Sequence, residues 1–160
     1  MTETRDHAGR DRGSVTRRHE APVVMQATPE HRAQVIALWH ACALTRPWND
    51  PTRDFDLAVG GATSAVLIVR EGGIAGSVMV GFDGHRGWVY YLAVRSDHRR
   101  RGLGRMLMTA AEDWLAARGA PKLQLMVRDG NDGAAAFYEA LGFERQPVAT
   151  YGRFMSENGR

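Results

Sequence analysis

Residues 90–105 decide the fold that this sequence predicts, and they read YYLAVRSDHRRRGLGR. The first part is an apolar run typical of a buried strand, and a short polar loop rich in arginine follows it. Leu103 then begins a segment with the apolar periodicity of an amphipathic helix. Gly102 and Gly104 leave the backbone bare where the loop turns into the helix, so several N–H groups can point at one anion. The stretch therefore predicts a phosphate site, suited to the pyrophosphate of a nucleotide-bearing cofactor.

Length and composition limit the class of protein. The chain has 160 residues, 44% of them hydrophobic and 24% charged, which suits one compact domain with a sizeable core. Its one cysteine, Cys42, excludes an internal disulfide and a Cys-x-x-Cys redox pair, and no metal site is predicted. No apolar run approaches the ~20 residues that cross a bilayer, and the first residues lack the apolar core of a signal peptide. We therefore expect a soluble, cytoplasmic protein with no membrane partner.

Charge is distributed unevenly along the chain. The net charge is +3, and among the 21 basic residues only Lys122 is a lysine. Residues 1–20 hold five arginines and show no apolar periodicity, which predicts a disordered Arg-rich tail before a single domain at 21–160. A nucleic-acid arm is the alternative, but no aromatic residue interrupts these charges for base stacking. We therefore predict no nucleic-acid partner.

The remaining pattern predicts alternating strands and helices. We expect strands at 22–27, 64–70, 74–82, 88–94 and 122–127, and one or two more within 143–155. We expect a helix soon after residue 28 and others at 52–59, 103–118 and 131–141. A turn at 71–73 makes the second and third of these strands a hairpin. This order predicts the α/β (α+β) class, with a mixed sheet and helices on both faces.

Two segments of the chain resemble one known superfamily. Residues 99–104, RRRGLG, match the Arg/Gln-x-x-Gly-x-Gly/Ala signature of the GCN5-related N-acetyltransferase (GNAT) superfamily, between its fourth strand and third helix. Residues 131–143, NDGAAAFYEALGF, resemble the family's Asn-x-x-Ala-x-x-Leu/Phe-Tyr-Glu-x-x-Gly-Phe segment. The resemblance covers about residues 23–155. The turn lacks the third glycine of a dinucleotide fold, and no Gly-Lys-Ser/Thr of a P-loop is present.

The resemblance implies a fold and an activity. The fold is a mostly antiparallel sheet of six to seven strands with about four helices, in which the fourth and fifth strands splay apart. The activity is transfer of an acetyl group from acetyl-CoA, without a metal, to an amine of a small molecule or a protein N-terminus. Residues 46–51 and 84–87 further resemble the bacterial YpeA-like subgroup. A non-catalytic acyl-CoA-binding or regulatory module is the alternative, and a homodimer is left open.

The resemblance also assigns residues to the cofactor. Those implied to bind it are Leu92, Ala93, Val94, Arg99, Arg100, Arg101, Gly102, Leu103, Gly104, Arg105, Asn131 and Tyr138. Tyr138 matches the tyrosine that in many relatives protonates the departing thiolate, and its alternative role is a core tyrosine beside Phe137. Asn131 matches a residue that hydrogen-bonds the cofactor arm, and it can equally cap the last helix.

The general base is less clear from the sequence. Many relatives carry a glutamate on the fourth or fifth strand, but no carboxylate lies in 88–94 or 122–127. His85 is one candidate, because an imidazole changes charge near neutral pH. Asp50 and Asp83 are two others, each acting through water. All three can equally be turn residues, and solvent is a further alternative.

The resemblance places the acceptor pocket at the loop between the first two helices. The residues predicted to line it are Trp48, Asn49 and Asp50, with Tyr90 and Tyr91 from the fourth strand. An aromatic ring beside a carboxylate can receive a cationic amine. Alternatively, Trp48 packs on the core and Asp50 caps the second helix. Since neighbouring strand residues face opposite ways, one of the two tyrosines should be core and the other free to border the pocket.

Overall fold

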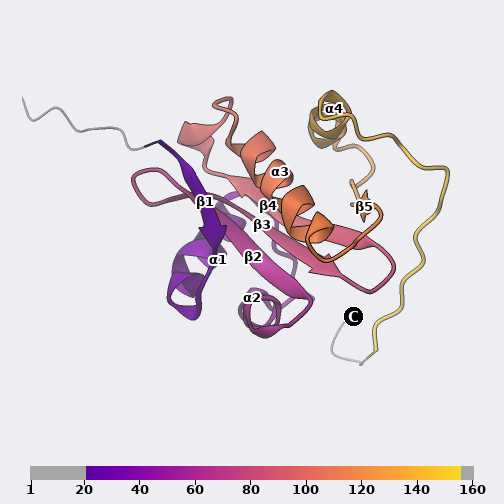
Figure 1. The fold of residues 1–160 in the computed structure, drawn as a ribbon, viewed down its shortest axis with the longest axis horizontal. Helices are drawn as coiled ribbons and strands as arrows, with labels where there is room; N and C mark the ends of the chain where they lie inside the picture. The colour runs from indigo at the N-terminus through magenta and orange to yellow at the C-terminus, as the bar shows by residue number, and fades with distance from the viewer. Residues whose placement is uncertain (1–20, 156–160) are drawn as a thin grey trace, which may run out of the picture.

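A computed structural model describes residues 21–155 and shows a single sheet between two layers of helices (Figure 1). The strands are β1 (Val23–Gln26), β2 (Ser64–Arg70), β3 (Ile74–Phe82), β4 (Gly87–Val94) and β5 (Leu123–Gln124). The helices are α1 (Arg32–Ala41), α2 (Pro51–Gly60), α3 (Leu103–Ala116) and α4 (Asp132–Ala140), with 3-10 turns at Pro29–His31 and Ser96–His98. The tail predicted at residues 1–20 lies outside the described residues. Within 21–155, no helix has both the length and the apolar character needed to cross a membrane.

The sheet is mixed and mostly antiparallel, as predicted. Its strands lie side by side in the order β1-β2-β3-β4-β5. All neighbours are antiparallel except β4 and β5, which run parallel. The expected hairpin is β2 and β3, joined by a short turn in which Gly72 and Gly73 have positive φ angles. β2 and β3 are therefore paired by a local connection, and β4 pairs with the other edge of β3.

Alternation along the strands divides the core into two halves. In β2, the side chains of Ala65, Leu67 and Val69 pack on the face covered by α3. The intervening Val66 and Ile68 pack on the opposite face, with α1 and α2. This period of two is typical of a strand buried on both sides. The predicted helices on both faces are confirmed, and in Figure 1 α3 crosses one face of the sheet while α1 and α2 lie behind the other.

A bulge and a splay interrupt the sheet at β4. Ser77 pairs with Ala93 and Met79 with Tyr90, so two β4 residues, 91 and 92, face the single residue Val78. Such a bulge bends the strand and redirects its side chains. β4 pairs with β5 only at its residues 87 and 88, so the two strands are already apart where the bulge begins. The expected splay of the fourth and fifth strands is therefore present.

The predicted strand count was too high. The described residues form five strands, and the run expected at 122–127 pairs over two residues only. No strand forms in the described part of 143–155. Side chains there are exposed, including Val148 (76%), Tyr151 (94%) and Met155 (89%). Phe143 still packs against the α3 half of the core, but residues with high strand propensity form a strand only where a sheet edge is available, and this segment pairs with none.

Candidate active site

The turn between β4 and α3 ends in a helix N-terminus that no side chain caps. The first bond within the helix joins the Met106 N–H to the Gly102 carbonyl at 3.0 Å. The N–H groups of Leu103, Gly104 and Arg105 therefore have no acceptor inside the helix. Together with the positive end of the helix dipole, these groups suit a bound anion.

Two glycines make this turn possible, for different reasons. Gly102 has a φ of 81°, a left-handed conformation that costs other residues roughly 1–2 kcal/mol. Gly104 has an ordinary φ, but a Cβ there would lie 3.1 Å from Cζ of Phe137 in α4. The missing side chain thus lets α4 pack directly on the turn. A ligand at the turn will consequently lie close to the side chains of α4.

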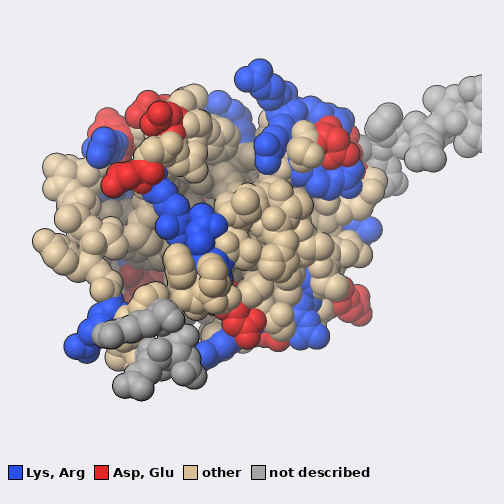
Figure 2. All heavy atoms as spheres, turned by 180° about the vertical axis from the view of Figure 1, so that it is seen from behind, with Lys and Arg blue, Asp and Glu red and all other residues tan. Residues whose placement is uncertain are grey.

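The arginines around the turn fall into two groups. Arg101 forms an ion pair with Glu71 in the β2–β3 turn, and Arg99 donates to the last carbonyl of β4 at 3.3 Å. Arg100 and Arg105 are exposed and make no side-chain hydrogen bond within the described part of the chain. Figure 2 shows basic side chains gathered at the end of the molecule that carries this loop, with acidic ones among them. Two of the arginines hold the loop, and two remain available to an anion.

A network of charges inside the loop holds it further. Arg95 donates to Asp97 at 2.6 Å, and Asp97 also contacts His98 Nδ1 at 2.8 Å. Hydrogen bonds from Arg95 and then His98 keep the pKa of Asp97 well below its usual range. On its other side, Nε2 of His98 lies 3.9 Å from Glu71. The loop is therefore held by contacts among its own residues and with Glu71 of the β2–β3 turn.

Leu92, Ala93 and Val94, the predicted strand edge, follow the bulge and lead into this loop. Ala93 is buried and pairs with Ser77 of β3 on one side. On the other side, no β5 residue pairs with the three, because the ladder ends at Trp88. An open edge of this kind can take an extended, amide-bearing chain as an added strand.

Asn131 and Tyr138 both belong to α4. The Asn131 side chain caps the helix by accepting from the Ala134 N–H at 3.2 Å, and this leaves its Nδ2 as a donor. The Tyr138 ring packs edge-on against Phe137 and Phe143, with centroids 5.1 and 5.8 Å apart. Burial raises the pKa of Tyr138 to about 12. Both roles suggested for Asn131 are compatible with this geometry, and the raised pKa keeps the Tyr138 hydroxyl protonated at neutral pH.

The three base candidates occupy turns. Asp50 caps α2 by accepting from the N–H groups of Thr52 and Arg53 at 3.0 and 3.1 Å. Asp83 accepts from the N–H groups of the two residues after Gly84, at 2.8 and 2.6 Å, and from the indole of the next tryptophan at 3.0 Å. Those backbone bonds lower the pKa of Asp83. His85 is exposed in the same turn, where its imidazole is free of hydrogen bonds among the described residues.

On the acceptor side the structure joins the loop after α1 to β4. The indole of Trp48 is 49% exposed, and the neighbouring Asn49 donates to the Tyr91 hydroxyl at 3.2 Å. Tyr91 is half-buried and stacks on Trp39, with centroids 4.3 Å apart and planes at 12°. Tyr90 is 44% exposed, and its β3 partner Met79 packs in the same half of the core as Tyr91. The two tyrosines differ in burial, but the bulge interrupts the expected alternation and leaves both on the face covered by α1 and α2.

Asp54 was missed by the sequence reasoning. The Tyr91 hydroxyl donates to its Oδ2 at 2.8 Å. Burial, and then the bond to Asp54, raises the pKa of Tyr91, so the phenol remains the donor. In the sequence, Asp54 is an ordinary acid in the first turn of a helix. Only the bulge of β4 brings the tyrosine to it.

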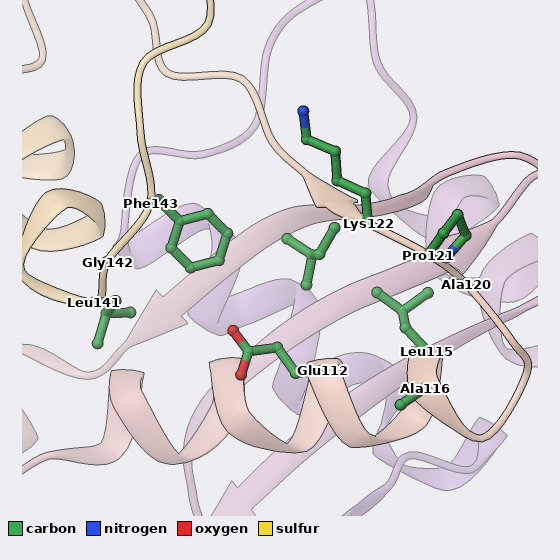
Figure 3. A pocket seen from close by; sticks show the side chains of 10 residues that line it. Glu112, Leu115, Ala116, Ala120, Pro121, Lys122, Leu141, Gly142 and Phe143 are labelled. Carbon is green, nitrogen blue, oxygen red and sulfur yellow. The ribbon is translucent and has the colours of Figure 1, made fainter.

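A separate cavity of about 330 Å³ lies at the far half of α3 (Figure 3). The side chains of Glu112 and Leu115 rise into it from α3, and the ring of Phe143 faces it from the segment after α4. Lys122 borders it but extends away from it toward Gln146. None of the predicted cofactor or acceptor residues lines this cavity. We therefore assign the candidate active site to the turn and the splay rather than to this hollow.

Comparison with known proteins decides the family. The family model described as Acetyltransferase (GNAT) family matches residues 32–143. This chain belongs to the GNAT acetyltransferase family. An acetyltransferase of Yersinia pestis (strain Pestoides F) is 45% identical over 121 residues, which cover 75% of this chain and 86% of the relative. An acetyltransferase of Pectobacterium atrosepticum is 44% identical over 125 residues, covering 78% and 89%.

A solved structure shows the same GNAT fold. Aminoglycoside N-acetyltransferase AAC(6')-Iy in complex with CoA superposes with a TM-score of 0.76 at 18% identity, covering 89% of this chain and 100% of the other. Both sequence segments that suggested the family lie within the matched region 32–143. The family resemblance is confirmed, and the narrower YpeA-like assignment stays a prediction.

Proposed function

We propose that this GNAT protein transfers the acetyl group of acetyl-CoA to an amine of a small molecule or a protein N-terminus. The observation that carries the proposal is the uncapped N-terminus of α3 next to the open edge of β4. The first suits a pyrophosphate and the second an extended arm with amide groups, and CoA contains both. The acetyltransferase names of the relatives from Yersinia and Pectobacterium support the same chemistry.

In this proposal, the backbone does most of the cofactor binding. The N–H groups of residues 100–105 hold the pyrophosphate, and Arg100 and Arg105 add charge. Residues 92–94 pair with the amides of the pantetheine arm, and Nδ2 of Asn131 donates to it. Bound acetyl-CoA supplies the thioester that the acceptor amine attacks directly, with both substrates held together. A strand N–H stabilises the oxyanion that forms.

We propose Tyr138 as the general acid for the leaving thiolate. Its raised pKa of about 12 means that the hydroxyl carries a proton whenever the enzyme works. Thiols ordinarily titrate at about 8.5, below this phenol, so the phenol mainly stabilises the developing thiolate by donating a hydrogen bond. Any proton that it passes to the sulfur is restored from solvent, which takes up the proton lost by the amine. The Phe137 and Phe143 rings hold the phenol in place.

For the base, the observations favour solvent over the three side chains. Asp50 and Asp83 already accept backbone hydrogen bonds, and the lowered pKa of Asp83 makes it a weaker base. His85 lies before Gly87, which is four residues and about 13 Å along β4 from the bulge. Deprotonation of the amine by water needs none of these groups at the thioester.

A non-catalytic acyl-CoA-binding module is the second candidate. It is favoured by one observation, the lack of any carboxylate on β4 or β5 where a base would meet the acceptor. Such a module would keep the turn before α3 and bind acetyl-CoA without turning it over.

Release of free CoA thiol separates the two candidates. Acetyl-CoA is incubated with the protein and a panel of amines that includes an aminoglycoside, a polyamine and peptides with free N-termini. We expect at least one amine to raise CoA release above the rate of hydrolysis. Tight acetyl-CoA binding with no release for any amine would contradict the enzyme and support the module.

A further inference from the structure

Tyr91 occupies the bulge of β4 in a conformation that tyrosine rarely adopts. Its φ is 52°, in the left-handed region, where non-glycine residues cost of the order of 1–3 kcal/mol. Such strain persists only where the surroundings hold the residue. Here the ring stacks on Trp39, which is buried and donates through Nε1 to Ser77 at 3.0 Å. The backbone of β4 is thus bent in a way that directs the phenol toward α2.

The phenol connects two segments that are far apart in the sequence. It donates to Oδ2 of Asp54 at 2.8 Å and accepts from Nδ2 of Asn49 at 3.2 Å. The Asn49 backbone is itself held, because its N–H donates to the Arg46 carbonyl at 3.0 Å. Oδ2 of Asp54 is therefore held in place by the hydroxyl of Tyr91, whose ring is itself held by the stack on Trp39.

The other oxygen of Asp54 has no donor among the described residues. No arginine or lysine of residues 21–155 lies within 4 Å of this carboxylate, whereas Asp56 on the same helix pairs with Arg32 at 2.9 Å. The charge of Arg46 reaches the phenol, but its guanidinium donates to the carbonyls of Ala43 and Thr45. Asp54 is half-buried, so its charge is partly withdrawn from solvent.

Strand β4 relates the Asp54 carboxylate to the proposed transfer site. Tyr91 directly precedes residues 92–94, the edge proposed for the cofactor arm. Asp54 faces the bulge from α2, on the side of the sheet opposite to α3. An acceptor that approaches from the α1–α2 side meets this carboxylate.

We propose that Asp54, held by Tyr91 and Asn49, pairs with an ammonium group of the acceptor. The acceptor is then a polycationic amine, one that carries a second positive charge besides the amine that reacts, rather than an amino acid with a nearby carboxylate. The proposal rests on the proposed function for the location of the transfer site. A hydrogen bond to a charged group contributes about 1.5–3 kcal/mol, which corresponds to about 10–100-fold in affinity.

Direct binding of spermidine to the CoA-saturated full chain tests the proposal by calorimetry. Asp54→Asn keeps an acceptor for the tyrosine hydroxyl but removes the charge, and we expect about 10–100-fold weaker binding. Tyr91→Phe keeps the stack on Trp39 and should weaken binding less. Asp56→Asn, on the same helix but paired with Arg32, is the matched control and should bind like the wild type. The melting temperature of each variant verifies folding.

Three results would overturn the proposal. They are equal spermidine affinity in Asp54→Asn and the wild type, glycine bound as tightly as spermidine, and no spermidine binding at millimolar concentration. CoA release with the same probes is measured separately. Asp54-dependent binding without release for any amine would contradict the proposed function and leave this inference standing. CoA release at the same rate in Asp54→Asn and the wild type would support the proposed function and contradict this inference.

Discussion

The cofactor side and the acceptor side of this protein are built in opposite ways. The proposed cofactor side consists mainly of one continuous segment, residues 92–105, in which backbone N–H groups and a strand edge supply the binding groups, with Asn131 of α4 added to it. The acceptor side joins three separate segments through side chains: Asn49 in the loop after α1, Asp54 in α2 and Tyr91 in the bulge of β4.

This difference teaches which substitutions each side tolerates. A site made of backbone depends on the residues that permit its conformation, above all Gly102 and Gly104. A site made of side chains depends on their charges and on the packing that positions them. Changes at the two sides should therefore separate cleanly, with one set altering acetyl-CoA binding and the other altering acceptor binding. The substitutions below test that separation.

The largest effect is expected at Tyr138, the proposed general acid for the chemical step. Tyr138→Phe keeps the packing against Phe137 and Phe143 but removes the hydroxyl. We expect transfer to slow by about 10²–10⁴-fold, while acetyl-CoA affinity stays within about twofold. Single-turnover rates and calorimetry measure the two quantities. An unchanged rate would remove Tyr138 from catalysis.

Gly104→Val should disrupt the cofactor side alone. The new Cβ would lie 3.1 Å from Cζ of Phe137, so α4 must shift, at a cost of about 1–3 kcal/mol. We expect acetyl-CoA affinity to fall at least about tenfold, with spermidine binding affected far less. Gly60→Ala in α2, where a Cβ meets nothing within 4 Å, is the matched control. An equal loss of acetyl-CoA and spermidine affinity would show that the two sides are not independent.

Ser77→Ala should act mainly on the acceptor side. It leaves Nε1 of the buried Trp39 without its partner, which costs about 1–3 kcal/mol of folding stability. Trp39 carries the Tyr91 ring, so spermidine binding should weaken while acetyl-CoA affinity holds. Denaturant unfolding gives the stability change. A variant as stable as the wild type would show that the indole finds another acceptor.

Arg105→Gln should weaken the cofactor side by charge alone. Arg105 is exposed and makes no side-chain hydrogen bond in the described part of the chain, so folding stability should not change. We expect about tenfold lower acetyl-CoA affinity and a shallower dependence on salt. Arg101→Gln, which loses the pair with Glu71, is the comparison, and it should lower the stability of the loop as well. Wild-type affinity in Arg105→Gln would exclude a phosphate contact.

The smallest effect is expected at His85. If solvent is the base, His85→Gln should change kcat/KM by no more than about twofold. The raised pKa of Tyr138 means that its proton is lost only as the pH approaches about 12, so the rate should not fall on its account between pH 6 and 10. Rates across that range measure both. A large loss of kcat/KM in His85→Gln would restore the imidazole as base.

Much of the fold could be predicted because its signals are local. The hairpin of β2 and β3 follows from two apolar runs around a Gly-Gly turn, and α2 begins at Asp50-Pro51, a cap followed by proline. The strands expected after Phe143 could not be judged in this way. Their residues have strand propensity, but β5 pairs over only two residues, and the segment finds no edge to join.

The sequence by itself determined the turn at residues 99–105 and the family. Its glycines and the helix that follows are consecutive, and backbone N–H groups need no distant partner to converge. Only the tertiary structure decided the acceptor side. The bulge at Tyr91 arises from the register between β3 and β4, and the carboxylate it meets lies 37 positions earlier in the chain. Contacts of that range depend on how layers pack, which periodicity and spacing do not encode.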